Sequence, residues 1–312
     1  MIPTLLFFRD YRTFQGGHLK VADYIAHTRS SGLFTPQLFM TPASLRVSPF
    51  PRDILVRRWN PSRADALFVA GMDWPHLPIG VEDRVPVINL IQHPRHALPD
   101  DPRAAFLTRR ATRICVSKEV SEAIRRTGRT NGPIHTIPAG VNGAPLSSSS
   151  VQERSIPVLI CGLKNPALAR GTAQALLDHG VNATVLTAPL PRTDYLRLLT
   201  QARIAITLPD AVEGFYLPAL EAMAAGCAVI CPDALGNRSF CRHGETCLMP
   251  EATPWALAQA ALRLIADQAF ARNLSSAGRQ EAQRFSLEAE RAAFLRLLHD
   301  LRCAISPALA RA

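Results

Sequence analysis

The stretch Ala202–Pro232, ARIAITLPDAVEGFYLPALEAMAAGCAVICP, predicts a strand, a loop, a short helix and a second strand. It begins with an apolar run of the length of a buried strand, which Pro209 ends. Pro218 suits the first position of a helix, because the N–H there has no intrahelical partner for proline to remove. Gly226 ends the helix before another apolar run. This order of elements is that of an α/β unit with parallel strands.

Two acidic residues, Glu213 and Glu221, stand eight positions apart and frame the N-terminus of the expected helix. Unpaired N–H groups and the helix dipole make such an end attractive to a phosphate. Carboxylates beside it suit the hydroxyl groups that flank a diphosphate, as in a nucleotide sugar. Alternatively, Glu221 complements the helix dipole, worth about 0.3–1 kcal/mol, and Glu213 is a solvated loop acid.

The segment EGFYLPALEAMAAGCAVI resembles the Glu-x7-Glu donor signature of the group 1 (family four) retaining glycosyltransferases, which have the GT-B fold. The following ALGNRSFCRHGETCLMP resembles the next segment of that family. The resemblance implies transfer of a sugar from a nucleotide-diphosphate donor with retention of configuration. It assigns Glu213 to the transferred sugar, Glu221 to the ribose, and Gly214 and Phe215 to the rest of the donor loop.

Two basic residues are candidates for binding the donor diphosphate. The family carries a Gly-Arg pair and then a Lys-Gly pair after the strand that opens its second domain. Here Gly162 is followed by Leu163 and Lys164, and Arg170-Gly171 replaces Lys-Gly. Lys164 and Arg170 are therefore the expected counter-charges, and the departure leaves the nucleotide open. The chain has no Asp-x-Asp and no zinc-ligand spacing, so no metal and no other cofactor is expected.

Residues 1–142 alternate strand-like and helix-like segments, which predicts a parallel sheet covered by helices on both faces. Ligands of such sheets bind at the carboxyl ends of the strands. The resemblance places a glycine-rich loop, RDYRTFQGGH with Gly16 and Gly17, against the donor phosphates. It also places a histidine near the reacting sugar. In QHPRH, His93 is the preferred candidate and His96 the next, although a loop histidine can be merely solvated.

The chain is expected to form two domains, because 312 residues exceed one ordinary domain. The small, polar segment GAPLSSSSVQERS indicates a linker. We expect a Rossmann-like acceptor domain over residues 1–145 and a Rossmann-like donor domain over 146–312, facing across a cleft as the GT-B resemblance implies. The amphipathic run Leu287–Leu301 is either a helix that returns to the first domain or a packing helix of the second.

Composition and charge indicate a globular protein with an anionic partner. The residues are 47% apolar and 19% charged, and no apolar run has the length of a membrane span. Seven scattered cysteines without a Cys-x-x-Cys pair favour reduced thiols in a cytoplasmic protein. Cys115, Cys161, Cys227 and Cys231 lie in apolar strand patterns and are expected in the core. The first 150 residues hold 19 of the 35 Lys and Arg but 11 of the 25 Asp and Glu, so most of the net charge of +10 lies there.

This basic half favours an anionic acceptor, such as a lipid-linked glycan, an acidic glycan or a nucleic acid, or peripheral contact with the inner membrane face. A solvated basic face without a partner is the alternative. Two other classes of function remain open: a sugar-nucleotide epimerase or phosphorylase on the same scaffold, and a non-catalytic binder of nucleic acid or membrane. The sequence shows no nucleic-acid-binding motif or aromatic stacking array.

Overall fold

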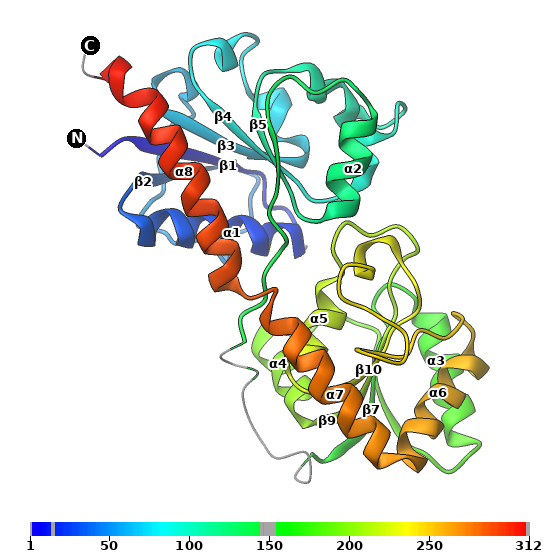
Figure 1. Cartoon of the computed structure of the whole chain (residues 1–312). Helices are drawn as coiled ribbons and strands as arrows, with labels where there is room; N and C mark the ends of the chain where they lie inside the picture. Colours follow the sequence, from blue (N-terminus) through cyan, green and yellow to red (C-terminus); the bar gives the residue numbers. More distant parts are fainter. Residues whose placement is uncertain (1, 14–15, 144–145, 147–153, 310–312) are drawn as a thin grey trace. The chain divides into compact units, whose positions relative to one another are not determined.

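The computed structural model describes residues 2–13, 16–143, 146 and 154–309 (Figure 1). It divides into two compact units. The first comprises Met1–Pro138 and Glu288–Ala312, and the second comprises Ala139–Leu287. The sequence predicts a single boundary after residue 145, whereas the units part after Pro138 and the chain rejoins the first unit at Glu288.

The first unit is built on a six-stranded sheet in the order β2-β1-β3-β4-β5-β6. All of its neighbouring strands are parallel, as the alternation of segments predicts. The middle strands β3 and β4 are buried throughout, because helices and loops cover both faces of the sheet. The strands are β1 (Thr4–Arg9), β2 (Thr35–Met40), β3 (Ala66–Ala70), β4 (Val87–Ile91), β5 (Thr112–Cys115) and β6 (Ile134–Thr136). The helices are α1 (Gly16–Ser31), α2 (Lys118–Arg126) and α8 (Leu287–Leu309).

A buried ion-pair cluster joins α8 to α1. Lys20 Nζ lies 2.6 Å from Glu290 Oε2 and 2.8 Å from Asp23 Oδ2. Burial raises the pKa of Asp23, and the neighbouring Lys20 lowers it in part. Phe294 of α8 packs edge-on against Tyr24 of α1 at 4.7 Å. The last helix therefore packs on the first unit through both charge and aromatic contacts.

A single buried arginine ties the loops of the first unit to β5. Arg113 is fully buried, and its guanidinium donates hydrogen bonds of 2.6–3.2 Å to five backbone carbonyls. These carbonyls belong to Phe106, Leu107, Arg109, Ala111 and Asn131. Burial lowers the pKa of Arg113 to about 10, so the side chain stays charged at neutral pH. The guanidinium takes the place of solvent at these carbonyls, and those of Phe106, Leu107 and Asn131 also accept a backbone N–H.

The second unit contains a four-stranded parallel sheet in the order β10-β9-β7-β8. Its strands are β7 (Ile156–Cys161), β8 (Ala183–Leu186), β9 (Ala202–Thr207) and β10 (Ala228–Ile230). Side chains of α4 and α5 pack on one face of the sheet, and those of α3 and α6 pack on the other. The helices are α3 (Pro166–Leu177), α4 (Arg192–Gln201), α5 (Leu217–Ala224), α6 (Pro254–Ala266) and α7 (Gln268–Gln283).

The decisive stretch folds as its sequence predicts, with β9, a loop, α5 and β10 in that order. Pro218 is the second residue of α5 rather than the first, a position that also lacks an intrahelical partner for its nitrogen. Gly226 has a φ of +76°, the left-handed conformation in which glycine commonly ends a helix.

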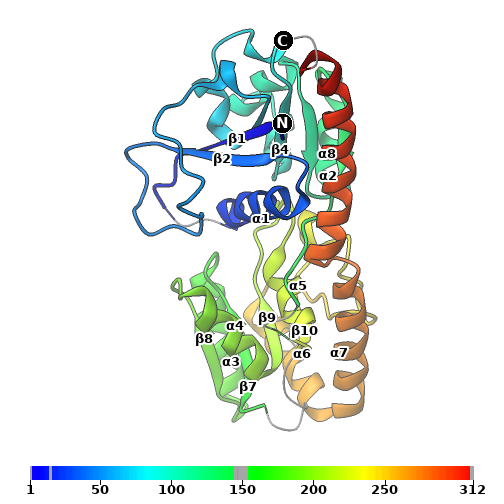
Figure 2. The ribbon, with the colours of Figure 1, turned by 90° about the vertical axis from the view of Figure 1, so that its left-hand side faces the viewer.

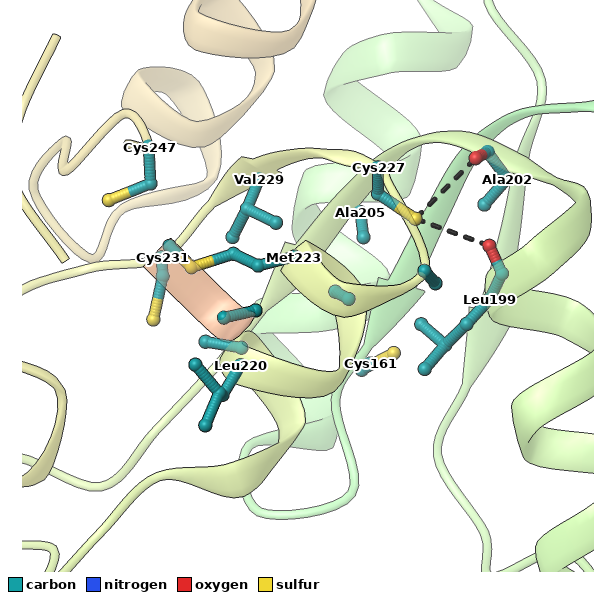
Figure 3. Close-up of a cluster of buried hydrophobic side chains, with 14 of the residues drawn as sticks. Cys161, Leu199, Ala202, Ala205, Leu220, Met223, Cys227, Val229, Cys231 and Cys247 are labelled. Carbon is teal, nitrogen blue, oxygen red and sulfur yellow. Dashed lines mark hydrogen bonds between the residues drawn. The ribbon is translucent and has the colours of Figure 1, made fainter. Parts of the chain in front are cut away.

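Buried thiols fill part of the second core (Figure 3). Cys227 Sγ lies 3.2 Å from the carbonyl oxygen of Leu199 and 3.5 Å from that of Ala202. Burial raises the pKa of Cys161 to about 12 and that of Cys227 to about 11, which keeps both thiols protonated. The prediction of core cysteines at positions 115, 161, 227 and 231 is confirmed. Within the described part of the chain, every helix is too short or too polar to span a bilayer.

Candidate functional site

The first acid of the Glu-x7-Glu pair is buried and paired with a lysine. Glu213 lies in the loop between β9 and α5, and only 8% of it is exposed. Its carboxylate forms an ion pair with Lys164, which comes from the loop after β7. The backbone N–H of Asp210 donates to the same carboxylate oxygen at 3.1 Å. The loops after two adjacent strands of the sheet thus bring the predicted residues Lys164 and Glu213 together.

Two glycines allow the chain to approach this pair closely. A Cβ on Gly236 would come within 2.6 Å of Glu213 Cβ, and the carbonyl of Gly236 accepts a 2.9 Å hydrogen bond from Tyr216 N–H. A Cβ on Gly162 would come within 2.2 Å of Ala169 Cβ in the first turn of α3. The segment that follows the Glu-x7-Glu stretch therefore lies directly against Glu213.

The second acid is paired with an arginine that sequence reasoning missed. Glu221 lies in α5, is 4% exposed, and forms an ion pair with Arg192 at the start of α4. The Arg192 guanidinium also lies 5.6 Å from the ring centre of Tyr195. The available signal was its position: Arg192 follows β8 and its loop, at the carboxyl edge of the sheet where ligands bind.

The remaining donor-loop candidates differ in their surroundings. Gly214 is buried, and the Phe215 ring packs 5.2 Å from Phe240 and 5.7 Å from Phe285. The Phe215 side chain is therefore partly buried, and its ring packs against the core of the second unit. Arg170 lies on the exposed side of α3, and no ion pair or hydrogen bond of its side chain occurs among the described residues.

In the first unit, the loop after β4 meets the first turn of α1, which follows β1. Gln92 Nε2 donates to the carbonyl of Gly17 at 3.2 Å, and a Cβ on Gly17 would come within 3.2 Å of that amide. Gly16 begins α1, while residues 14 and 15 of the glycine-rich segment lie outside the described residues. His93 caps a 3-10 helix over Pro94–Ala97, and its Nδ1 accepts a 3.1 Å hydrogen bond from Arg95 N–H.

His18 ends the glycine-rich segment RDYRTFQGGH and was not among the candidates from the sequence. His18 Nδ1 is buried and has no hydrogen-bond partner within the described residues. Burial, and then the charge of Arg9, lower the pKa of His18 to about 4, so the ring is neutral at physiological pH. Its ring packs edge-on against Tyr11 at 4.9 Å.

His96 is buried, and we expect it to make the first unit sensitive to acid. Burial, followed by the charge of Arg103, lowers the pKa of His96 to about 3. Below about pH 6.5, His96 binds a proton in the unfolded chain but stays neutral in the folded chain. Its contribution to the free energy of unfolding is therefore fully present above that pH and is lost as the pH falls. We expect the free energy of unfolding to drop by roughly 0.7 kcal/mol between pH 7 and pH 6 through this residue.

Urea unfolding at both pH values tests this expectation. The pH dependence should shrink in His96→Gln and persist in His135→Gln, which removes an exposed histidine of the same unit. Identical pH dependence in wild type and His96→Gln would contradict the assignment.

Over the described ranges, no three His, Cys, Asp or Glu side chains are grouped so as to hold a metal ion.

Comparisons with known proteins identify a family in the second half of the chain. Residues 146–281 match the family "Glycosyl transferases group 1". The D-inositol 3-phosphate glycosyltransferase of Corynebacterium urealyticum is 29% identical over 198 residues, which are 61% of this chain and 45% of that protein. The match thus spans less than half of the relative's length.

Solved structures resemble the whole chain. Sucrose-phosphate synthase from Thermosynechococcus elongatus has a TM-score of 0.72 at 16% identity, covering 97% of this chain and 100% of that one. Anabaena Alr3699/HepE in complex with UDP and glucose has a TM-score of 0.73 at 14% identity, covering 96% and 100%.

Each unit contains a sheet of parallel strands, and in the second unit the Glu-x7-Glu pair frames the start of α5. This architecture, together with the similar solved structures, defines a protein of the GT-B fold class. Within this fold, residues 146–281 match the group 1 glycosyltransferase family.

Proposed function

We propose that the protein is a glycosyltransferase that moves a sugar from a nucleoside-diphosphate donor to an anionic acceptor, with retention of configuration. The observation that carries the proposal is the pairing of both buried acids with cations, Lys164 from the loop after β7 and Arg192 from the start of α4. Burying charge is costly unless each charge is compensated. Neither a dipole-complementing acid nor a solvated loop acid would need such partners.

The four side chains supply the groups that a sugar nucleotide requires. The side chains of Lys164 and Arg192 are partly exposed to solvent. Each can therefore change rotamer and move from its carboxylate partner to a phosphate oxygen of the donor. With the N–H groups at the start of α5, they would stabilise the charge that develops on the leaving diphosphate. Arg170 is proposed to add to this counter-charge.

The two carboxylates, released from their cations, can accept hydrogen bonds from hydroxyl groups. We assign Glu213 to the transferred sugar and Glu221 to the ribose, as the family resemblance implies. Contact with the transferred sugar orients the anomeric carbon and so acts on the chemical step. In the first unit, the roles of Gly16, Gly17 and His93 in donor binding stay predictions from the resemblance.

A UDP-sugar is the proposed donor. The similar Anabaena protein holds UDP or UDP-glucose, and the pneumococcal O-GlcNAc transferase GtfA holds UDP and GlcNAc. An anionic acceptor is supported by the basic first half and by the names of similar proteins. These include D-inositol 3-phosphate glycosyltransferase and the UDP-forming α,α-trehalose-phosphate synthase of Burkholderia vietnamiensis. We expect the protein to act in the cytoplasm.

A thermal-shift screen tests donor binding. UDP, GDP and ADP are each added in steps to the full chain, and one of them, expected to be UDP, should raise the melting temperature in a saturable way. At a hundredfold excess over its dissociation constant, a ligand stabilises by about 2.7 kcal/mol. No shift with any nucleoside diphosphate would overturn the proposal.

Replacing Glu221 by glutamine should weaken UDP binding about fivefold. A hydrogen bond to a charged acceptor is worth roughly 1 kcal/mol more than one to a neutral amide, and the substitution changes little else in volume. Isothermal titration calorimetry measures the affinity, and Glu251→Gln removes an exposed acid of the same unit as the control. Equal UDP affinity in wild type and a folded Glu221→Gln variant would contradict the ribose assignment.

A further inference from the structure

The segment between β2 and Pro61 combines exposed arginines with exposed aliphatic side chains. We call residues 41–58 the basic-apolar segment; Figure 2 shows it among the blue loops beside β2. Val47 is 85% exposed, Leu45 47% and Leu55 43%. The exposed cations of the basic-apolar segment are Arg46, Arg52, Arg57 and Arg58. Its one acid, Asp53, is ion-paired with Arg29 of α1, so the surface carries surplus positive charge.

The segment surrounds a hollow of about 330 Å³. Phe50 is buried and forms part of its apolar lining together with Leu45 and Leu55. Arg46 and Arg52 also line it, and Arg52 Nη2 donates to the carbonyl oxygen of Arg46 at 3.2 Å. An apolar lining with two neighbouring guanidinium groups suits a molecule that is anionic at one end and apolar at the other.

Backbone hydrogen bonds hold the segment to the carboxyl edge of the first sheet. Leu45 N–H donates to the carbonyl of Tyr11 at 2.7 Å, and Tyr11 N–H donates to Ser44 Oγ at 3.0 Å. Further along, Val56 N–H donates to the carbonyl of Leu38 in β2 at 2.9 Å. The exposed aliphatic side chains are therefore displayed by an anchored segment. These side chains do not contribute to the core of the unit. An exposed apolar patch of this kind marks an interaction site.

We propose that the basic-apolar segment docks the protein on an anionic phospholipid surface. Leu45, Val47 and Leu55 enter the boundary between headgroups and acyl chains, while the arginines pair with lipid phosphates. One lipid phosphate lies at the hollow, between Arg46 and Arg52. The inference rests on the proposed function: a transferase bound to a membrane would act on an acceptor that lies in the same membrane.

The side-chain chemistry favours lipid over nucleic acid. Single-stranded nucleic acids bind to basic grooves in which aromatic rings stack on the bases. Here the exposed apolar groups are aliphatic, Phe50 is buried, and the indole N–H of Trp59 is bonded to the carbonyl of His76 at 2.7 Å. Aliphatic side chains offer no stacking surface but insert readily between lipid chains.

Vesicle co-sedimentation of the full chain tests the proposal. Vesicles of phosphatidylcholine with a quarter phosphatidylglycerol should bind the protein, and pure phosphatidylcholine vesicles should bind it at least about tenfold more weakly. Raising the salt from about 0.1 M to about 1 M should weaken binding to the anionic vesicles, because the Debye length falls from about 10 Å to about 3 Å.

Matched variants separate this surface from net charge. Arg46→Gln/Arg52→Gln should weaken vesicle binding about tenfold or more, and Leu45→Ser/Val47→Ser should also weaken it. The control, Arg126→Gln/Arg129→Gln, removes the same charge from exposed positions at the end of α2, next to the opposite edge strand β6. It should bind within about twofold of wild type, because the proposed surface is intact.

Several outcomes would overturn the lipid inference. These are equal binding to neutral and anionic vesicles, binding to neither, equal losses in the arginine variant and its control, or unchanged binding in the serine variant. Release from vesicles by a single-stranded oligonucleotide, with oligonucleotide affinity unchanged in the serine variant, would indicate nucleic acid instead. The UDP-induced thermal shift is scored separately in wild type. A shift without vesicle binding refutes only the lipid inference, and vesicle binding without a shift refutes only the transferase.

Discussion

Turnover should fall ten- to a hundredfold when Glu213 is replaced by glutamine, while affinity for UDP stays within about twofold of wild type. The buried carboxylate is the group assigned to the hydroxyls of the transferred sugar, so its charge matters as the anomeric carbon reacts. UDP lacks that sugar and should not sense the change directly. Steady-state kinetics with the sugar donor and calorimetry with UDP measure the two quantities.

Asp210→Asn is the matched control for this variant. Asp210 Oδ2 also lies near Lys164 Nζ, at 3.8 Å, but its side chain is largely exposed. Its substitution removes a charge from the surroundings of the same lysine and leaves the buried carboxylate in place. Wild-type turnover in Glu213→Gln, or an equal loss of turnover in Asp210→Asn, would contradict the assignment of Glu213 to the transferred sugar.

Replacing Arg113 by methionine should destabilise the first unit by about 3–5 kcal/mol. The change removes one donor from each of five backbone carbonyls, of which three keep a backbone N–H. Each of the other two, left unsatisfied, costs about 1–3 kcal/mol before the loops relax. Methionine keeps most of the side-chain volume, so lost hydrogen bonds rather than a cavity dominate the effect.

Urea unfolding followed by tryptophan fluorescence measures this loss. Trp59 and Trp74 lie in the first unit, and a Trp255→Phe background removes the emission of the second. Arg110→Met, at an exposed position three residues earlier, is the control. A difference below about 0.5 kcal/mol between the two variants, the range of ordinary surface substitutions, would contradict the role given to Arg113.

The elements around the Glu-x7-Glu stretch were predictable because their signals are local. The apolar run from Ala202, the proline at 218 and the glycine at 226 specify β9, α5 and the turn before β10 without reference to the rest of the chain. The alternation of segments in residues 1–142 likewise predicts a parallel sheet, which the first unit contains.

The pairing of side chains could not be predicted, because it depends on the order of strands in the sheet. Glu213 and Lys164 are 49 residues apart, and they meet because β9 lies next to β7. Glu221 and Arg192 are 29 residues apart and meet through α5 and α4. Periodicity identifies strands and helices but not their neighbours. For the same reason the sequence did not reveal that the Phe215 ring joins an aromatic cluster.

Product analysis with a UDP-sugar labelled in the sugar tests the central claim most directly. The full chain is incubated with each labelled donor, with and without anionic lipid extract, and the products are separated and identified by mass spectrometry and NMR. We predict that UDP is released together with transfer of the label to an acceptor, and that the new bond keeps the anomeric configuration of the donor. Conversion of the donor sugar without an acceptor, or no consumption of any nucleotide sugar, would contradict the account.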